Sequence, residues 1–210
     1  MNKQIASTSI VLALLLFANT SYAFEDIDVM LGARYEHGRM GNTEMNVPNR
    51  DMNALWVDGI AAKKITQDLA LGIDLDIGVQ RQQTDIQSVN RTNEQGWGWL
   101  AGVGATYRVN DQIGVVAAAD FAGKYYFSYS TSANQSDYLD RPFAWRIGTQ
   151  YFPPQYPGWS ADLFLHHIDW RNFVVSGSDN SHTTAQSTLA IGLSYHFATG
   201  QVAGEQPSEH

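Results

Sequence analysis

Residues 69–80 read LALGIDLDIGVQ, and this stretch decides the fold. Large aliphatic side chains occupy every second position, and small or polar side chains lie between them. Successive side chains of a β-strand point to opposite faces, so this period of two predicts a strand with one apolar and one polar face. The same alternation starts at Ile27, Trp97, Ile113 and Leu189, and is weaker in 51–65, 140–152 and 159–173. The sequence therefore predicts an all-β protein with eight strands of about 13 to 16 residues each.

The composition limits the function classes. The chain has 210 residues, of which 16% are charged, no cysteine and a formal net charge of −8. This length fits one domain, and the charged fraction lies below the roughly 25% of soluble domains. The absence of cysteine excludes disulfides, thiolate metal sites and a cysteine nucleophile. The acidic balance disfavours nucleic acid as a partner, because phosphate backbones bind basic surfaces.

The N-terminal segment has the pattern of a secretory signal peptide. Lys3 precedes an apolar run at 10–18, and Ser21 and Ala23 form a small-x-small cleavage pattern. We expect residues 1–23 to be removed on export. No later apolar stretch reaches the roughly 18 residues of a membrane-spanning helix, so a membrane could be crossed only by strands.

The connections between the predicted strands alternate in length. Short turns are expected at 66–68, 109–112 and 153–158, and longer polar segments at 41–50, 83–94, 130–139 and 174–184. Outer-membrane barrels show this alternation, with short periplasmic turns and longer external loops. An even number of strands would return both ends of the barrel to the periplasmic side.

Aromatic residues gather near both ends of the predicted strands, on the same face as the aliphatic residues. The set toward the long connections comprises Tyr35, Trp97, Trp99, Tyr125, Phe127, Tyr129, Phe143 and Trp145. The set toward the short turns comprises Tyr107, Tyr151, Trp159, Tyr195 and Phe197. Transmembrane barrels place aromatic girdles at both membrane interfaces, whereas a soluble β-sandwich, the alternative fold, does not require them. We therefore predict an eight-stranded antiparallel transmembrane β-barrel with an up-and-down meander.

Over residues 24–197 the chain resembles the small eight-stranded outer-membrane barrels of the OmpA/OmpX type. Residues 192–197 read GLSYHF and look like the terminal signal that such barrels present to the outer-membrane assembly machinery. The resemblance implies that Gly192, Tyr195 and Phe197 form this assembly signal. It also implies a place in the outer membrane of a Gram-negative bacterium, in contact with membrane lipid and lipopolysaccharide. We expect residues 198–210 to be a short polar periplasmic tail.

The faces opposite the aliphatic stripes would line the barrel lumen, and they carry charges of both signs. Six of these residues should meet near mid-depth: Arg34, Asp58, Asp74, Asp76, Asp120 and Arg146. The same faces carry Asp28, Glu36, Arg108, Lys124, Asp162, His166 and His196. Side chains just fill an eight-stranded barrel, so the charges must pair with one another or with water. Two interpretations stay open: a polar core that plugs the lumen, or a gate in a narrow cation-selective path.

Catalytic motifs are scarce. Some barrels of this size modify lipid A, and deacylases among them carry a His-x-Ser pair on one strand, which this chain lacks. The motif Gly-x-Ser-x-Gly is also absent. Glu36 and His37 are the one pair worth testing as a base and its orienting group, but adjacent strand residues face opposite sides. His166 and His167 are divided in the same way, which is poor geometry for a metal. We expect no catalytic residues, no metal and no cofactor.

These observations favour a non-enzymatic outer-membrane barrel with a structural or surface-interaction role. The long connections would form the surface that meets an external ligand, because binding concentrates in loops on a rigid scaffold. The alternatives are a narrow channel for small solutes or ions and a lipid A-modifying enzyme. Fold analogy alone does not choose among them.

Overall fold

The computed structural model describes residues 27–42, 47–84, 92–128, 137–175, 178–180 and 184–198. The expected signal peptide at 1–23, nearly all of the expected tail at 198–210 and large parts of the long connections lie outside the described residues. Within these ranges, no helix has the length and apolar character needed to cross a membrane.

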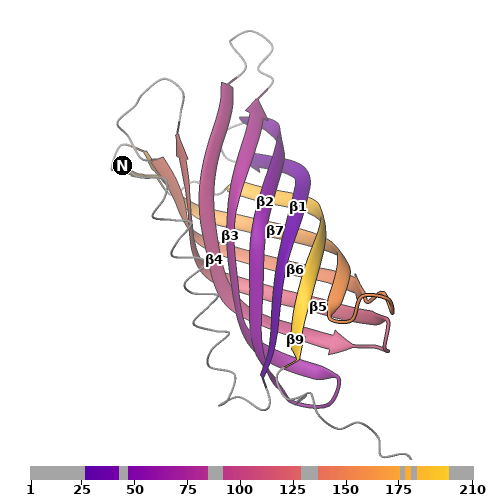
Figure 1. Ribbon diagram of the computed structural model, residues 1–210. Helices are drawn as coiled ribbons and strands as arrows, with labels where there is room; N and C mark the ends of the chain where they lie inside the picture. The colour runs from indigo at the N-terminus through magenta and orange to yellow at the C-terminus, as the bar shows by residue number, and fades with distance from the viewer. Residues whose placement is uncertain are drawn as a thin grey trace, which may run out of the picture.

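The described residues form nine strands, and eight of them close into a barrel (Figure 1). The strands are β1 (Ile27–Asn42), β2 (Val47–Lys64), β3 (Leu69–Thr84), β4 (Thr92–Arg108), β5 (Ile113–Ser128), β6 (Asp137–Tyr151), β7 (Trp159–Val175), β8 (Ser178–Asn180) and β9 (Thr184–Ala198). The strand outside the barrel, β8, is a three-residue segment that pairs with the end of β7. It lies inside the expected loop 174–184, and β2 and β6 also begin earlier than expected.

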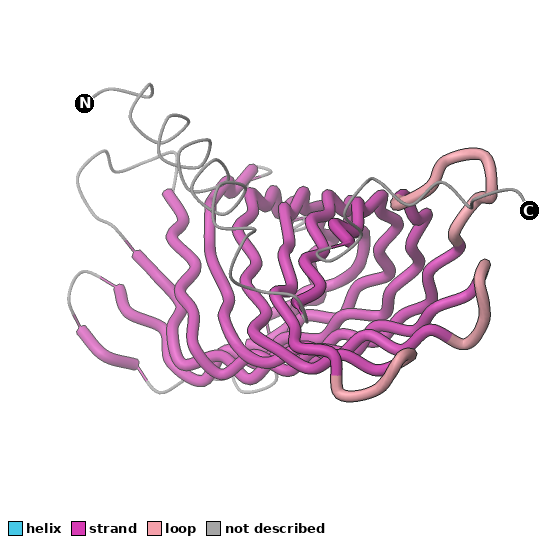
Figure 2. The backbone as a smooth tube through the Cα atoms, turned by 60° about the horizontal axis from the view of Figure 1, so that its bottom comes forward, coloured by secondary structure: helices cyan, strands magenta, loops and turns pink. Residues whose placement is uncertain are grey.

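The barrel is an antiparallel meander closed by its first and last strands. Each barrel strand pairs with the strands before and after it, apart from the excursion through β8. The pairing of β1 with β9 closes the ring and runs from Asp28 opposite Ala198 to Asn42 opposite Thr184. Figure 2 shows the strands curving together around one interior. The predicted all-β class and the eight-stranded barrel are therefore confirmed.

The outward face of the barrel is an apolar belt. On β3 the side chain of Ile73 is 68% exposed, and its neighbours on the same face are exposed as well: Leu71, Leu75, Ile77 and Val79. Similar exposed aliphatic residues lie on β2, β7 and β9. A continuous apolar exterior is unfavourable in water but contacts hydrocarbon chains in a bilayer. This belt makes the molecule a barrel of the transmembrane type.

Aromatic residues flank the belt at both rims. Those exposed toward the short turns are Tyr107, Tyr151, Trp159 and Phe197, and those exposed toward the long connections are Tyr35, Trp97, Phe143 and Trp145. Trp99 and Tyr195 are half-buried. Tyr129 and the side chain of Phe127 lie outside the described residues. The predicted girdles are confirmed at these positions, and Tyr125 is the exception.

A bulge in β5 reverses which side chains face the lumen. The register between β4 and β5 shifts by one residue, because Ala101 pairs with Ala122 whereas Gly102 pairs with Asp120. An extra residue moves every later side chain to the other face. Tyr125 is therefore inside the lumen, where it is 1% exposed, and Lys124 is outside, with its amine 4.6 Å from the ring centre of Tyr138. The predictions that Tyr125 faces lipid and that Lys124 faces the lumen were wrong.

The short turns are held by local hydrogen bonds. Thr66 Oγ1 accepts the amide N–H of Leu69 at 3.0 Å, and Asn110 Oδ1 accepts two following amides at 2.9 Å. Hydroxyl and amide side chains stabilise tight turns in this way. In the third turn Gly158 has a φ of +83°, and its carbonyl accepts the N–H of His196 at 2.7 Å. Glycine is favoured there because it adopts positive φ without a steric penalty.

Candidate functional site

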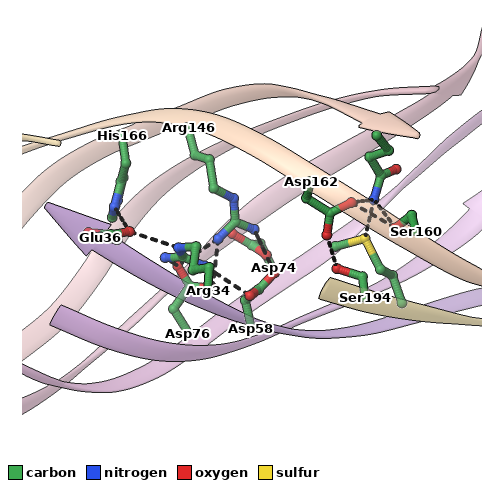
Figure 3. Close-up of polar contacts among 12 residues, drawn as sticks. Arg34, Glu36, Asp58, Asp74, Asp76, Arg146, Ser160, Asp162, His166 and Ser194 are labelled. Atoms are coloured by element: carbon green, nitrogen blue, oxygen red, sulfur yellow. Dashed lines mark hydrogen bonds and ion pairs between the residues drawn. The ribbon is translucent and has the colours of Figure 1, made fainter. Parts of the chain in front are cut away.

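Five of the six residues predicted near mid-depth form one ion-pair network across the lumen (Figure 3). Arg34 on β1 places Nη2 2.6 Å from Asp76 Oδ2 and Nη1 3.2 Å from Asp58 Oδ1. Arg146 on β6 places Nη2 2.9 Å from Asp74 Oδ1. All of these side chains are buried. The network therefore connects β1, β2, β3 and β6 through the interior of the barrel.

Asp76 is the centre of this network. Its carboxylate accepts both Nη atoms of Arg34, at 3.2 and 2.6 Å, and Arg146 Nη1 at 3.0 and 2.9 Å. Charge-assisted hydrogen bonds of this kind are the strong ones, and they compensate for the cost of removing charge from water. One carboxylate thus holds two guanidinium groups that would otherwise repel each other.

Glu36 and His166 extend the network toward β7. Glu36 Oε1 accepts Arg34 Nε at 2.8 Å and lies 2.7 Å from His166 Nδ1. Thr188 Oγ1 donates to Glu36 Oε2 at 3.1 Å. The side chains of Glu36 and His166 were expected in the lumen but not in the mid-depth group. Two signals could have placed them there. Glu36 lies two residues after Arg34 on β1, and His166 lies opposite Arg146 in the register of β6 with β7.

Asp120 lies beside this network without a hydrogen bond. Both of its carboxylate oxygens are buried and have no hydrogen-bond partner among the described residues. Its carboxylate lies within 4.8 Å of those of Asp74 and Asp76. We define the charged belt as Arg34, Glu36, Asp58, Asp74, Asp76, Asp120, Arg146 and His166. In the belt five carboxyl groups face two guanidinium groups, so acidic groups are in excess.

Apolar layers lie on both sides of the charged belt, an arrangement that the alternation of the sequence does not predict. The outer apolar cluster, toward the long connections, comprises Met40, Met52, Ala54, Trp56, Leu100, Tyr125, Leu139, Ala144, Ile168 and Trp170. The inner apolar cluster, toward the short turns, comprises Met30, Ile60, Ala62, Ala70, Val116, Phe164 and Ala190. On β2 the sequence Trp56, Asp58, Ile60 passes from one layer through the belt to the other, and each of these side chains is buried. The interior is therefore layered rather than uniformly polar.

A second polar group lies toward the end with the short turns. Asp162 accepts hydrogen bonds from Ser160 at 2.7 Å, from Gln150 at 3.1 Å and from Ser194, and Figure 3 shows this group apart from the charged belt. His196 Nε2 lies 3.3 Å from Ser160 Oγ. Nearby, the guanidinium carbon of Arg108 stacks 3.5 Å from the ring centre of Phe152. These contacts lie at the mouth of the barrel on this side.

The residues of the predicted assembly signal lie at the end of β9. Gly192 faces the lumen, where a Cβ atom would lie 3.1 Å from Arg34 Cβ. Tyr195 and Phe197 face outward, with ring centres 4.7 Å apart, and Tyr195 also packs on Trp159 at 5.3 Å. They belong to the aromatic girdle on the short-turn side. Their role in assembly stays a prediction.

The suggested pair of Glu36 and His37 does not form. Glu36 is buried in the charged belt, whereas His37 is exposed on the outer face and places Nδ1 2.9 Å from Asn53 Oδ1. His166 and His167 are divided in the same way, as the alternation predicts. No base with an orienting carboxylate therefore arises at positions 36 and 37.

A closed eight-stranded antiparallel barrel with an aliphatic belt between aromatic rims is the fold of the small outer-membrane barrel proteins. Among solved structures the chain is similar to Ail, the attachment invasion locus protein of Yersinia pestis, in complex with the heparin analogue sucrose octasulfate. The two share 13% identity over 82% of this chain and 99% of that one, with a TM-score of 0.53. Neisserial surface protein A is similar at 12% identity over 80% and 97% of the two chains, with a TM-score of 0.52. No protein-family model and no curated protein matches the sequence.

Proposed function

We propose that this chain is a bacterial outer-membrane barrel protein with a structural or surface-interaction role and a lumen that does not conduct. The observation that carries the proposal is the layered interior, in which a charged belt lies between two buried apolar clusters. The fold shared with Ail and Neisserial surface protein A supports the membrane placement.

The packing of the lumen supports closure in two ways. An ion that entered from the side of the long connections would first have to displace the outer apolar cluster, in which Trp56 and Trp170 are 1% exposed. It would then meet guanidinium groups already bound to carboxylates at 2.6 to 3.2 Å. Breaking a buried ion pair costs about 3–5 kcal/mol when one partner is left alone. The interior thus acts as a core that ties the strands together.

Conductance of the purified protein in a planar bilayer tests this proposal, with Asp74→Asn and Arg146→Gln variants measured beside it. We expect a silent bilayer from all three proteins, with folding checked by the faster migration of an unheated barrel on a denaturing gel. Steady openings of the unmodified protein that change with either substitution would contradict closure.

The excess of carboxyl groups in the charged belt favours one alternative, a narrow cation path. Asp74, Asp76 and Asp120 would then attract cations to mid-depth, because rings of acidic side chains select cations. Selectivity for potassium over chloride that is lost in Asp74→Asn would promote this alternative over the closed barrel. Anion selectivity would exclude both.

We propose that the outer surface of the barrel contacts the partners of this protein. The exposed aliphatic belt fits contact with outer-membrane lipid and lipopolysaccharide, and the long connections would meet an external ligand. The outward ring pair of Tyr195 and Phe197 fits recognition by the assembly machinery. We expect Phe197→Ser to lower the amount of heat-shifted barrel in outer membranes while synthesis of the chain is unchanged. Equal amounts of folded barrel would exclude an assembly role for this residue.

A further inference from the structure

Three side chains on the lipid-facing surface form a serine, histidine and carboxylate arrangement. His167 on β7 places Nδ1 2.8 Å from Ser187 Oγ on β9, and Nε2 3.2 Å from Asp169 Oδ1 on its own strand. His167 and Ser187 are direct partners in the register of β7 with β9. Asp169 lies two residues beyond His167 and therefore on the same face.

The two contacts of His167 favour one tautomer of its ring. A carboxylate only accepts hydrogen bonds, so the contact of Nε2 with Asp169 Oδ1 favours the neutral tautomer that carries its proton on Nε2. Nδ1 then carries the lone pair and accepts the hydroxyl proton of Ser187. This is the arrangement of a nucleophile, a general base and an orienting acid, with the two ring nitrogens exchanged relative to the usual serine hydrolase order.

Other described histidines lack this arrangement. His37 contacts an amide oxygen of Asn53, and His166 has a buried Nε2 without a hydrogen-bond partner. His196 contacts Ser160, but there the serine already donates to Asp162, so the carboxylate binds the serine rather than the histidine. Within the described residues, His167 is the one that lies between a hydroxyl and a carboxylate.

The group is accessible from the outer face and lies at the upper rim of the apolar belt. Ser187 is exposed, and on β9 the next outward residues toward the short turns are the exposed Leu189 and Ile191. His167 lies eight residues beyond Trp159 on β7. At ~3.3 Å per residue and a tilt of ~40°, this separation is about 20 Å along the membrane normal. The ring of Trp145, an aromatic of that rim, stacks on His167 at 5.6 Å.

Aromatic rims of barrels lie at the membrane interface, where the acyl ester bonds of lipids meet the headgroup region. A lateral row of cross-strand partners crosses it, in the order Asp51, Arg39, Ser187, His167 and Trp145. Arg39 thus flanks Ser187 on β1, with a side chain that is 73% exposed and an Nε that lies 3.8 Å from Asp51 Oδ1. A guanidinium there suits the anionic headgroups of lipids and the negative charge that develops on an attacked carbonyl oxygen.

We propose that Ser187, His167 and Asp169 form a catalytic site that hydrolyses fatty acyl esters of membrane lipids. Ser187 Oγ attacks the ester carbonyl carbon while its proton passes to His167 Nδ1. The carbon–oxygen bond to the lipid alcohol breaks, and that oxygen takes the proton from His167. Water, deprotonated by His167, then attacks the acyl-serine and releases a fatty acid, and Ser187 regains its proton. The net reaction turns one ester and one water into one acid and one alcohol. This inference goes beyond the structural role proposed above and uses the same membrane placement.

The experiment uses the protein folded in two kinds of vesicle, one of phosphatidylethanolamine alone and one that also contains lipopolysaccharide. A fluorophosphonate probe reports the nucleophile by mass spectrometry, and the released fatty acids report turnover. Lipid A yields 3-hydroxy fatty acids and phospholipid yields unhydroxylated ones, so the two vesicles separate the sources. Ser187→Ala and His167→Asn remove the nucleophile and the base. His37→Asn is the matched control, because His37 is also an outward histidine of the same region but has no serine partner.

We expect the probe on Ser187 and fatty acid release in at least one vesicle, with release falling at least 100-fold in Ser187→Ala and His167→Asn. His37→Asn should keep both signals. For Asp169→Asn, which acts through His167, we expect a change in the pH profile of release with the folded fraction unchanged. A folded barrel without release above Ser187→Ala would overturn the proposal, as would probe on Ser187 without release from either lipid. The gel shift of the folded barrel separates these results from a failure to insert.

Discussion

Asp76 stabilises the lumen because both guanidinium groups of the charged belt bind to it. We expect Asp76→Asn to lower the free energy of unfolding by about 3–5 kcal/mol, since it leaves Arg34 and Arg146 buried without a common counterion. Urea unfolding of the barrel in lipid vesicles, followed by tryptophan fluorescence, measures this change. A loss below about 1 kcal/mol, which is roughly the error of such a measurement, would mean that the network adds little to stability.

Asp120 should behave in the opposite way. Its buried carboxylate has no hydrogen-bond partner among the described residues and lies close to two other carboxylates. Removing an uncompensated buried charge relieves a cost of about 1–3 kcal/mol, so we expect Asp120→Asn to raise the free energy of unfolding. The same urea titration serves, with Asp76→Asn as the matched comparison. Equal losses in the two variants would contradict the separate roles assigned to these aspartates.

At the level of single residues, the period of two predicted the lumen charges of the charged belt but misplaced Lys124, which follows the bulge in β5. It placed Arg34, Asp58 and Arg146 correctly because charge on an inward position is conspicuous in sequence. It did not predict the outer and inner apolar clusters. Trp56 and Ile60 are inward residues of the same alternation, but they are apolar like the outward residues of β2, so polarity does not distinguish the two faces there. It also missed the contact of His167 with Ser187, which are 20 residues apart and meet through register alone.

Among the elements, β5 separates what a pattern can predict from what it cannot. A bulge adds one residue without any composition signal, so the alternation read from Ile113 stays correct up to the bulge and is inverted after it. β1, β3 and β9 contain no such shift along the predicted stripe, and there the predicted faces are confirmed.

The bulge makes a testable prediction at Lys124 and Tyr125. The chain has no cysteine, so single cysteines report their own surroundings. We expect Lys124→Cys, which faces outward, to react with a membrane-permeant maleimide in the folded barrel, and Tyr125→Cys, which lies in the outer apolar cluster, to stay unmodified until the barrel is unfolded. The reverse order of reactivity would show that β5 alternates without interruption.

For the whole molecule, the apolar belt predicts where charge is tolerated. Ile73 lies in the middle of the belt, whereas Ile65 lies in a short turn, and both side chains are well exposed. We expect Ile73→Arg to lower the free energy of unfolding in a bilayer by about 2–4 kcal/mol, and Ile65→Arg by at most about 1 kcal/mol. Unfolding in vesicles measures both. Similar losses at the two positions would mean that the bilayer does not cover the barrel at the depth assigned here.

The pairing of β1 with β9 means that closure joins the two ends of the barrel sequence, from Asp28 to Ala198. The remaining barrel seams join strands that follow one another closely in sequence, so they can form before the last strand, β9, is available. This last seam cannot, and until it forms the sheet has two free edges that invite pairing with other chains. Closing so long a loop is also slow. The chain is therefore most vulnerable before this seam forms, during its transit to the membrane. A chain that ends before Thr184 would leave both sheet edges accessible to proteases.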